Sequence, residues 1–240
     1  MKKIAIVLTV ICLMAFKPEV KDKVLIFSLT KGYHHLTITD GIIAIQKLGA
    51  ENNFDVDTTT NAAKFTDDNL KNYKALIFLS PTGDDLFNAD QQLAFQNYIH
   101  HGGGYVGIHA ATDCLFTWEW YGKLVGAYFT KHPKIQQATL NVVDKTNIST
   151  KMLPTTWSHT DEWYNFKDVN PDIKVLISVD EKTYTGGEMN GNHPISWYHK
   201  FEGGRVFYTA LGHTKEDYAT DTLFIQHILG GIKYALGRKK

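Results

Sequence analysis

Short apolar runs alternate with amphipathic stretches in the first half of the chain. A buried strand of a parallel sheet is apolar throughout, whereas a helix on the sheet repeats apolar residues every three or four positions. The apolar and alternating runs predict strands at 23–29, 54–60, 74–80 and 105–108. The helical spacing predicts helices between them, at 38–48, 65–73 and 89–101. Strands alternating with helices in this way predict an α/β fold with a mostly parallel sheet and helices on both faces.

The second half of the chain follows a less regular pattern. Four further strands and one closing helix are predicted, at 135–144, 173–180, 193–199, 204–211 and 220–236. The connections between these strands are long, and long loops in a compact domain commonly carry function. We therefore expect binding or catalytic residues in the second half as well as at the strand ends of the first.

Composition narrows the range of partners. The chain has 240 residues and is 43% hydrophobic, which is enough for one substantial core. Lys plus Arg and Asp plus Glu both number 25, so the formal charge is zero and no basic stripe is available to neutralise phosphates. We expect one domain and no nucleic-acid partner, and the composition favours no particular oligomeric state.

Residues 1–20 have the pattern of a secretory signal peptide. Two lysines precede an apolar run from Ile4 to Phe16, which is too short to span a bilayer as a helix. The alternative is a first buried strand, but 23–29 suits that role better. We expect cleavage between about residues 15 and 22, export to the periplasm or beyond, and no membrane association afterwards. Cys114 is then the lone cysteine of the mature chain.

The segment 101–113, HGGGYVGIHAATD, contains a predicted strand that ends in a tight turn. Gly102, Gly104 and Gly107 match the letters of a dinucleotide fingerprint, but they end a helix and enter a strand, which is the wrong order. We therefore expect no nucleotide cofactor. Small residues around position 109 are typical of a nucleophile elbow, yet the residue there is His109 instead of serine or cysteine.

Five segments together resemble one protein family. They are GGGYVGIHAATD, WYGKLVGAYFTKHP at 120–133, TDEWYNF at 160–166, HPISWY at 193–198 and YTALGHTKEDY at 208–218. The chain is similar to the ThuA-like (trehalose utilisation) family. This resemblance implies a ThuA-like domain over 23–238, with the flavodoxin-like fold of class I glutamine amidotransferases. It also implies histidine in place of their catalytic cysteine, so amidotransferase activity is not expected.

The resemblance assigns one more histidine. A Gly-aromatic-x-His motif in the first strand-to-helix loop of the family is matched by Gly32-Tyr33-His34-His35. His35 takes the family position, and His34 stands where the family often has arginine. An anion contact through that arginine is accordingly not expected here.

Three predicted strands are each followed by a histidine. His35 follows the first strand, His109 the strand at 105–108, and His213 the strand at 204–211. The carboxyl ends of parallel strands meet at one crevice, so these three are candidate ligands of a divalent metal such as Zn²⁺ or Mn²⁺. The alternative for each is a hydrogen-bonded loop histidine.

Aromatic and polar residues mix in the predicted loop that contains Asp161 and Glu162. All five tryptophans lie between positions 118 and 197, several beside polar neighbours. Flat rings next to hydrogen-bonding groups suit a sugar, although large core side chains explain two or three of them equally well. The candidates for substrate binding are His35, Trp118, Trp163, Tyr164 and His193.

Two functions from different classes fit these residues. The first is an exported hydrolase or lyase for a sugar, with the family implying a disaccharide or 3-keto-sugar. His109 and His213 would polarise the carbonyl, and Glu162 would remove a proton, with Asp161 as the second choice of base. The second is a non-catalytic carbohydrate-binding domain, in which the histidines only bond hydroxyl groups.

Overall fold

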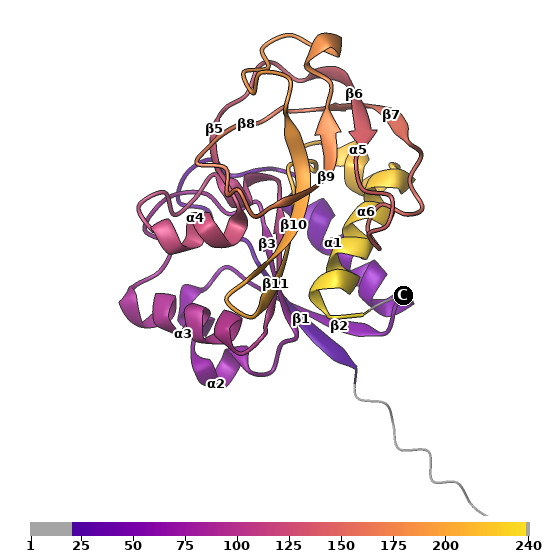
Figure 1. Cartoon of the computed structure of the whole chain (residues 1–240). Coiled ribbons are helices and arrows are strands. Elements are labelled where there is room, and N and C mark those ends of the chain that lie inside the picture. The colour runs from indigo at the N-terminus through magenta and orange to yellow at the C-terminus, as the bar shows by residue number, and fades with distance from the viewer. Residues whose placement is uncertain (1–20, 239–240) are drawn as a thin grey trace, which may run out of the picture.

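A nine-stranded sheet runs through the computed structural model, which describes residues 21–238 (Figure 1). Its strand order is β2-β1-β3-β4-β11-β10-β9-β6-β7, and β5 and β8 form a separate two-stranded sheet. The strands of the large sheet are β1 Asp22–Phe27, β2 Phe54–Thr59, β3 Ala75–Leu79, β4 Gly104–Ile108, β6 Gln136–Val142, β7 Thr156–Asp161, β9 Lys174–Val179, β10 Pro194–Phe201 and β11 Gly204–Thr209. The small sheet pairs β5 Tyr128–Lys131 with β8 Asn165–Lys167.

Strands β2, β1, β3, β4 and β11 pair in parallel. Numbered along the chain, these five have the order 2-1-3-4-5, which is the flavodoxin-like order. The remaining pairings are antiparallel, so only β10 and β6 run against the others and seven of the nine strands share one direction. The predicted α/β fold with a mostly parallel sheet is confirmed.

Helices cover both faces of the parallel part, as the apolar strand sequences predicted (Figure 1). On one face lie α1 Ile38–Glu51, α5 Lys215–Ala219 and α6 Thr222–Ala235; on the other lie α2 Asp67–Leu70, α3 Ala89–His100 and α4 Glu119–Val125. Phe95 of α3 stacks on Phe78 of β3 with 5.2 Å between ring centroids. On the opposite face, Gly231 of α6 lies so close to Phe207 that a Cβ there would stand 2.3 Å from the ring.

Side-chain caps explain where several helices begin. Thr66 accepts a hydrogen bond from the Asn69 N–H at the start of α2, and Asn88 forms a reciprocal capping box with Gln91 at the start of α3. Asp221 accepts the N–H groups of Leu223 and Phe224 and so begins α6. The helix predicted at 220–236 is therefore correct in place, but a separate short helix, α5, precedes it.

One sequence prediction about the second half is wrong in part. Asp161 and Glu162 were expected in a loop; Thr156–Asp161 instead forms the edge strand β7, paired with β6, whereas Glu162 lies in the short loop between β7 and β8, as expected. The residues of β7 alternate between exposed and buried positions, with polar residues on the outer face. Such alternation is a weaker sequence signal for a strand than a continuous apolar run. Strands β5 and β8, of four and three residues, are too short to have been predicted from spacing, and helix α4 was not predicted.

Within the described part of the chain, no helix has the length and hydrophobicity needed to cross a bilayer. The proposed signal peptide, residues 1–20, lies outside the described residues.

Candidate functional site

His109 stands at the turn that ends β4. Its backbone has φ +52°, a left-handed conformation that is uncommon for histidine, and a 3₁₀ turn, His109–Thr112, follows. The adjoining strand residue Gly107 leaves room for this turn, because a Cβ there would stand 2.9 Å from the Tyr208 ring. The sharp turn lifts the fully buried imidazole of His109 over the carboxyl edge of the sheet.

Hydrogen bonds fix which nitrogen of His109 faces the site. Nδ1 lies 2.8 Å from the Ala210 carbonyl oxygen, to which it donates, so in the neutral ring Nε2 carries the lone pair. Nε2 lies 3.1 Å from the Tyr164 hydroxyl and 3.2 Å from Nδ1 of His213. An imidazole held this way by a backbone carbonyl is oriented as a metal ligand or a proton acceptor.

Glu162 brings a carboxylate to the same point from the end of β7. Its Oε2 is 3.1 Å from His213 Nδ1 and 3.4 Å from His109 Nε2. The three atoms therefore form a triangle with edges of 3.1, 3.2 and 3.4 Å. Ligands of a tetrahedral Zn²⁺ at about 2.0–2.1 Å are about 3.3–3.4 Å apart, so this triangle has the size of one face of such a site.

His35 completes the group from the loop after β1. Its ring centroid is 4.7 Å from that of His109 and 5.6 Å from that of His213, and both contacts are edge-to-face. Its Nδ1 is buried and, among the described residues, has no hydrogen-bond partner. Ligand atoms of His35, His109, Glu162 and His213, here called the histidine cluster, all lie within 4.8 Å of one another. A buried, unpaired nitrogen and a set of three imidazoles with one carboxylate fit a divalent transition metal.

Burial and mutual contact set the charges in the histidine cluster. Burial, together with the charges of His109 and His213, lowers the pKa of His35 to about 3, so this ring is neutral. Burial opposes ionisation of Glu162, yet its contacts with the His109 and His213 rings hold its pKa well below the usual range. Burial likewise opposes charge on His213, but the Glu162 carboxylate raises its pKa. The cluster thus holds one firmly ionised carboxylate beside imidazoles of different basicity.

Two titratable residues next to the cluster were missed from the sequence. His132 has its Nε2 3.4 Å from Glu162 Oε1, and its side chain is 34% exposed, so it links the cluster to solvent. Burial raises the pKa of Asp113 to about 6, partly offset by the charges of His109 and His132. Both residues lie in quoted family segments, at 120–133 and 102–113, but no spacing rule brings them to the cluster.

Four residues predicted to touch substrate have different positions. Tyr164 is buried with its hydroxyl on His109, whereas Trp163 is fully buried and its Nε1 donates to the Gln136 carbonyl. His193 is also fully buried, and its Nε2 is 2.7 Å from the Tyr164 carbonyl oxygen. Trp118 stacks on Trp120 and Tyr121 in another aromatic group. Trp163 and His193 are thus held by buried hydrogen bonds to backbone carbonyl groups, and the assignment of these residues to substrate contact stays a prediction.

Cys114 does not replace the missing amidotransferase thiol. It is fully buried, and its Sγ lies 3.5 Å from the Tyr121 hydroxyl. Burial raises the pKa of the thiol far above its usual value, so the nucleophilic thiolate is not formed near neutral pH.

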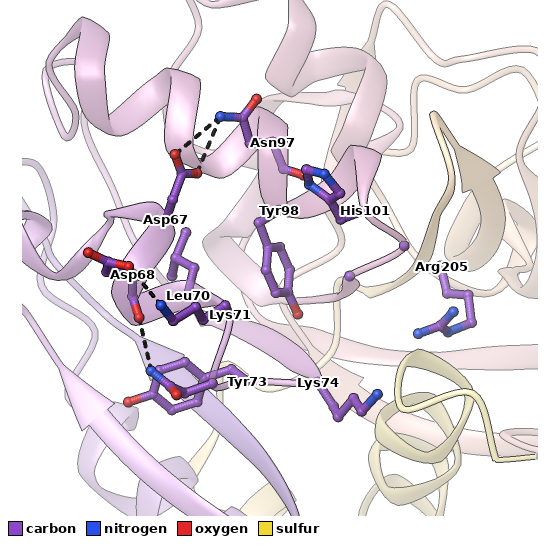
Figure 2. Close-up of a pocket in the computed structure, with 13 residues that line it drawn as sticks. Asp67, Asp68, Leu70, Lys71, Tyr73, Lys74, Asn97, Tyr98, His101 and Arg205 are labelled. Atoms are coloured by element: carbon purple, nitrogen blue, oxygen red, sulfur yellow. Dashed lines mark hydrogen bonds and ion pairs between the residues drawn. The ribbon is translucent and has the colours of Figure 1, made fainter.

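A cavity of about 640 Å³ lies at the opposite, amino edge of β3, β4 and β11 (Figure 2). Around it Lys71 bonds Asp68, and Asn97 bonds Asp67, while Lys74 and Arg205 add positive charge on the other side. None of the residues predicted for the site lines this cavity. The chemically distinctive residues gather at the carboxyl edge instead, as expected for this fold.

Family comparison agrees with this geometry. The sequence model of the ThuA family, described as trehalose utilisation, matches residues 23–235. The chain belongs to the ThuA family. The resemblance inferred from the five segments is thereby confirmed, and all members of the histidine cluster lie inside the matched range of this ThuA-family protein. No curated protein sequence matches the chain.

Solved structures support the same family and fold. A ThuA-like protein of Bacteroides uniformis is 26% identical with a TM-score of 0.76, and the match covers 89% of this chain and 91% of that one. A ThuA-like protein of Parabacteroides merdae is 20% identical with a TM-score of 0.71, covering 91% of both. A β-galactosidase of Bacillus circulans shares the fold at 13% identity and a TM-score of 0.59, over 91% of this chain but 31% of its own.

Proposed function

We propose that this ThuA-family protein is an exported enzyme that acts on a keto-sugar or glycoside by polarising a carbonyl group and moving a proton. The histidine cluster carries this proposal, because three imidazoles and a carboxylate meet at the carboxyl edge of the sheet. The membership of a trehalose-utilisation family supports a sugar as the substrate. The basic and apolar pattern of residues 1–20 supports export.

His35, His109, Glu162 and His213 would hold a divalent metal. The triangle of ligand atoms and the unpaired Nδ1 of His35 support this assignment. A bound Zn²⁺ or Mn²⁺ supplies Lewis acidity, which polarises a carbonyl and acidifies the neighbouring C–H.

The residues of the chain provide the proton path. Glu162 has two differently placed oxygens: Oε2 faces His109 and His213, whereas Oε1 faces His132. A proton taken from the carbon next to the carbonyl would pass to Oε1 and from there to the partly exposed His132, which reaches solvent. Tyr164 donates its hydroxyl hydrogen bond within the site, and its buried ring excludes water on that side.

An exposed aromatic ring marks the mouth of the site. Tyr33 is 64% exposed, and its ring centroid is 4.8 Å from that of His35. The loop that carries it is held by the Thr82 hydroxyl, which donates to the Tyr33 carbonyl at 2.8 Å. A ring in this position suits the apolar face of a sugar, and it would serve the alternative function, a non-catalytic carbohydrate-binding domain, equally well.

The test compares metal content, binding and turnover in the mature protein. Metal would be measured by elemental analysis, and 3-keto-glucosides and their parent disaccharides would be followed by NMR for product and for exchange of the C2 proton. We expect Glu162→Gln to lower turnover and exchange at least 100-fold, because general-base help contributes about 10²–10⁴-fold. The matched control is Glu202→Gln, which breaks a similar pair, 2.6 Å from His100, at the other edge of the sheet.

The outcomes separate the two functions. Turnover that depends on Glu162 but not on Glu202 supports the enzyme. Sugar binding without turnover or exchange, with or without added metal, replaces it with the carbohydrate-binding domain. A protein that binds neither metal nor sugar overturns both.

A further inference from the structure

Asp161, which the sequence offered as a second choice of catalytic base, is bonded to two separate segments of the site. It is fully buried at the end of β7. Its Oδ1 accepts the Glu162 N–H at 2.7 Å, and its Oδ2 accepts the Gly212 N–H at 3.0 Å. Gly212 directly precedes His213, so one carboxylate holds the backbone beside two members of the histidine cluster.

We propose that Asp161 is a positioning residue that fixes Glu162 and His213 relative to each other, held in place by the buried cation of His159. This proposal deepens the proposed function, since it names the support of the same site. Both oxygens of Asp161 accept backbone N–H groups and neither reaches solvent, which leaves them no access to a substrate proton. Glu162, by contrast, keeps both oxygens toward histidine side chains.

The turn before His213 depends on this contact. Gly212 has φ +115°, and a Cβ there would stand 2.6 Å from the Tyr218 hydroxyl, so the chain passes through a narrow space. The segment is held at three points: the Ala210 carbonyl accepts from His109, the Gly212 N–H donates to Asp161, and His213 Nδ1 contacts Glu162. Removing the carboxylate leaves a buried N–H without an acceptor, which is costly, so we expect the turn to shift and to move His213.

His159 makes a buried negative charge at Asp161 tolerable. Its Nε2 lies 3.5 Å from Asp161 Oδ2 and 3.1 Å from Asp217 Oδ1, and its Nδ1 lies 3.1 Å from Asp221 Oδ2. Carboxyl groups thus lie 3.1–3.5 Å from both ring nitrogens, an arrangement that favours the charged ring, although Nε2 has no aligned hydrogen-bond acceptor among the described residues. A buried carboxylate without such a partner would be strongly destabilising.

The same contacts favour an ion cluster over a second metal site at His159, Asp217 and Asp221. A metal ion binds one ring nitrogen, but Asp217 and Asp221 stand at different nitrogens of the ring. Their other oxygens accept backbone N–H groups: Asp217 Oδ2 that of Thr214 at 2.8 Å, and Asp221 Oδ1 that of Leu223 at 2.8 Å. Each carboxylate oxygen therefore has a protein partner, and the cluster ties α5 and α6 to β7.

The experiment compares Asp161→Asn with Asp221→Asn in the mature protein. Both remove one charge that faces His159, but only Asp161 touches the backbone next to Glu162 and His213. Zn²⁺ affinity would be measured by competition with a chelator, and the ring nitrogens of the histidines would be observed by NMR without metal. We expect Asp161→Asn to weaken Zn²⁺ binding about 10–100-fold, as loss of a supporting contact typically does, and to shift the His213 ring signals.

Asp221→Asn should move the His159 signals and lower the unfolding temperature, but leave the His213 signals and the Zn²⁺ affinity within about threefold. If Asp161→Asn does not fold, Asp161→Glu keeps the negative charge while displacing it from the two N–H groups. Unchanged His213 signals in the Asp161 variants, or equal changes in Asp221→Asn, overturn the positioning role. If the wild-type protein does not bind Zn²⁺, the metal site of the proposed function is refuted. The NMR comparison of the variants still decides the role of Asp161.

Discussion

His159→Gln tests the buried ion cluster through the pH dependence of folding stability. Burial alone would lower the pKa of His159, but Asp161, Asp217 and Asp221 raise it from 6.5 to about 11. A pKa raised in the native state means that the stabilisation is fully present below pH 6.5, where the unfolded chain also holds the proton. It is then lost as the pH rises toward 11.

The size of the effect follows from one proton. Between about pH 7 and 10 the native state holds one proton more than the unfolded chain, so the contribution falls by about 1.4 kcal/mol per pH unit. Glutamine at position 159 carries no such proton. Because His159→Gln leaves the buried carboxylates without their cation, we expect the variant to unfold with about 3–5 kcal/mol less free energy than wild type near pH 7. The difference in unfolding free energy between wild type and His159→Gln should therefore shrink by about 2–3 kcal/mol from pH 7 to pH 9.

Urea unfolding of both proteins at pH 7, 8 and 9 measures this difference directly. Groups that titrate equally in the two proteins cancel in the subtraction. NMR of the His159 ring gives a second readout, and we expect the doubly protonated form at pH 9. A difference that is independent of pH, together with a neutral ring at pH 8, would refute the imidazolium and with it the account of the ion cluster.

Three further predictions concern other parts of the chain. Because Cys114 is buried and its pKa is raised, the native protein should not hydrolyse glutamine, and iodoacetamide should label the thiol only after unfolding. A glutaminase activity that is lost in Cys114→Ala would contradict this. Gly230→Ala in α6 should destabilise the domain by about 1–3 kcal/mol in thermal unfolding, because the added Cβ would stand 2.2 Å from the Ser149 Cα; an unchanged melting temperature would show that the backbone yields freely. Asn88→Ala removes the capping box of α3 and should cost about 0.5–2 kcal/mol, whereas Asn88→Asp should keep most of that stability, as urea unfolding would show.

The sequence by itself determined the fold to a large extent. The apolar strands at 74–80 and 105–108 and the helix at 89–101 were predicted because a sheet covered on both faces leaves continuous apolar runs. The same logic predicted that His35, His109 and His213 follow strand ends, and the structure brings the three rings within 5.6 Å of one another. Parallel strands share a direction, so residues at their ends become neighbours by topology alone.

Only the tertiary structure decided which acidic residue does what. Asp161 and Glu162 are adjacent in sequence but point in different directions. Asp161, the last residue of β7, points toward the Gly212 backbone N–H, whereas Glu162 points toward His213 in the histidine cluster. His132 reaches Glu162 from the connection after β5, a strand too short to leave a pattern. The His159 ion cluster joins β7 to two helix starts more than fifty residues away. Hydrophobic periodicity records burial and period within an element, but contacts between side chains from distant elements depend on how those elements pack, which no local pattern contains.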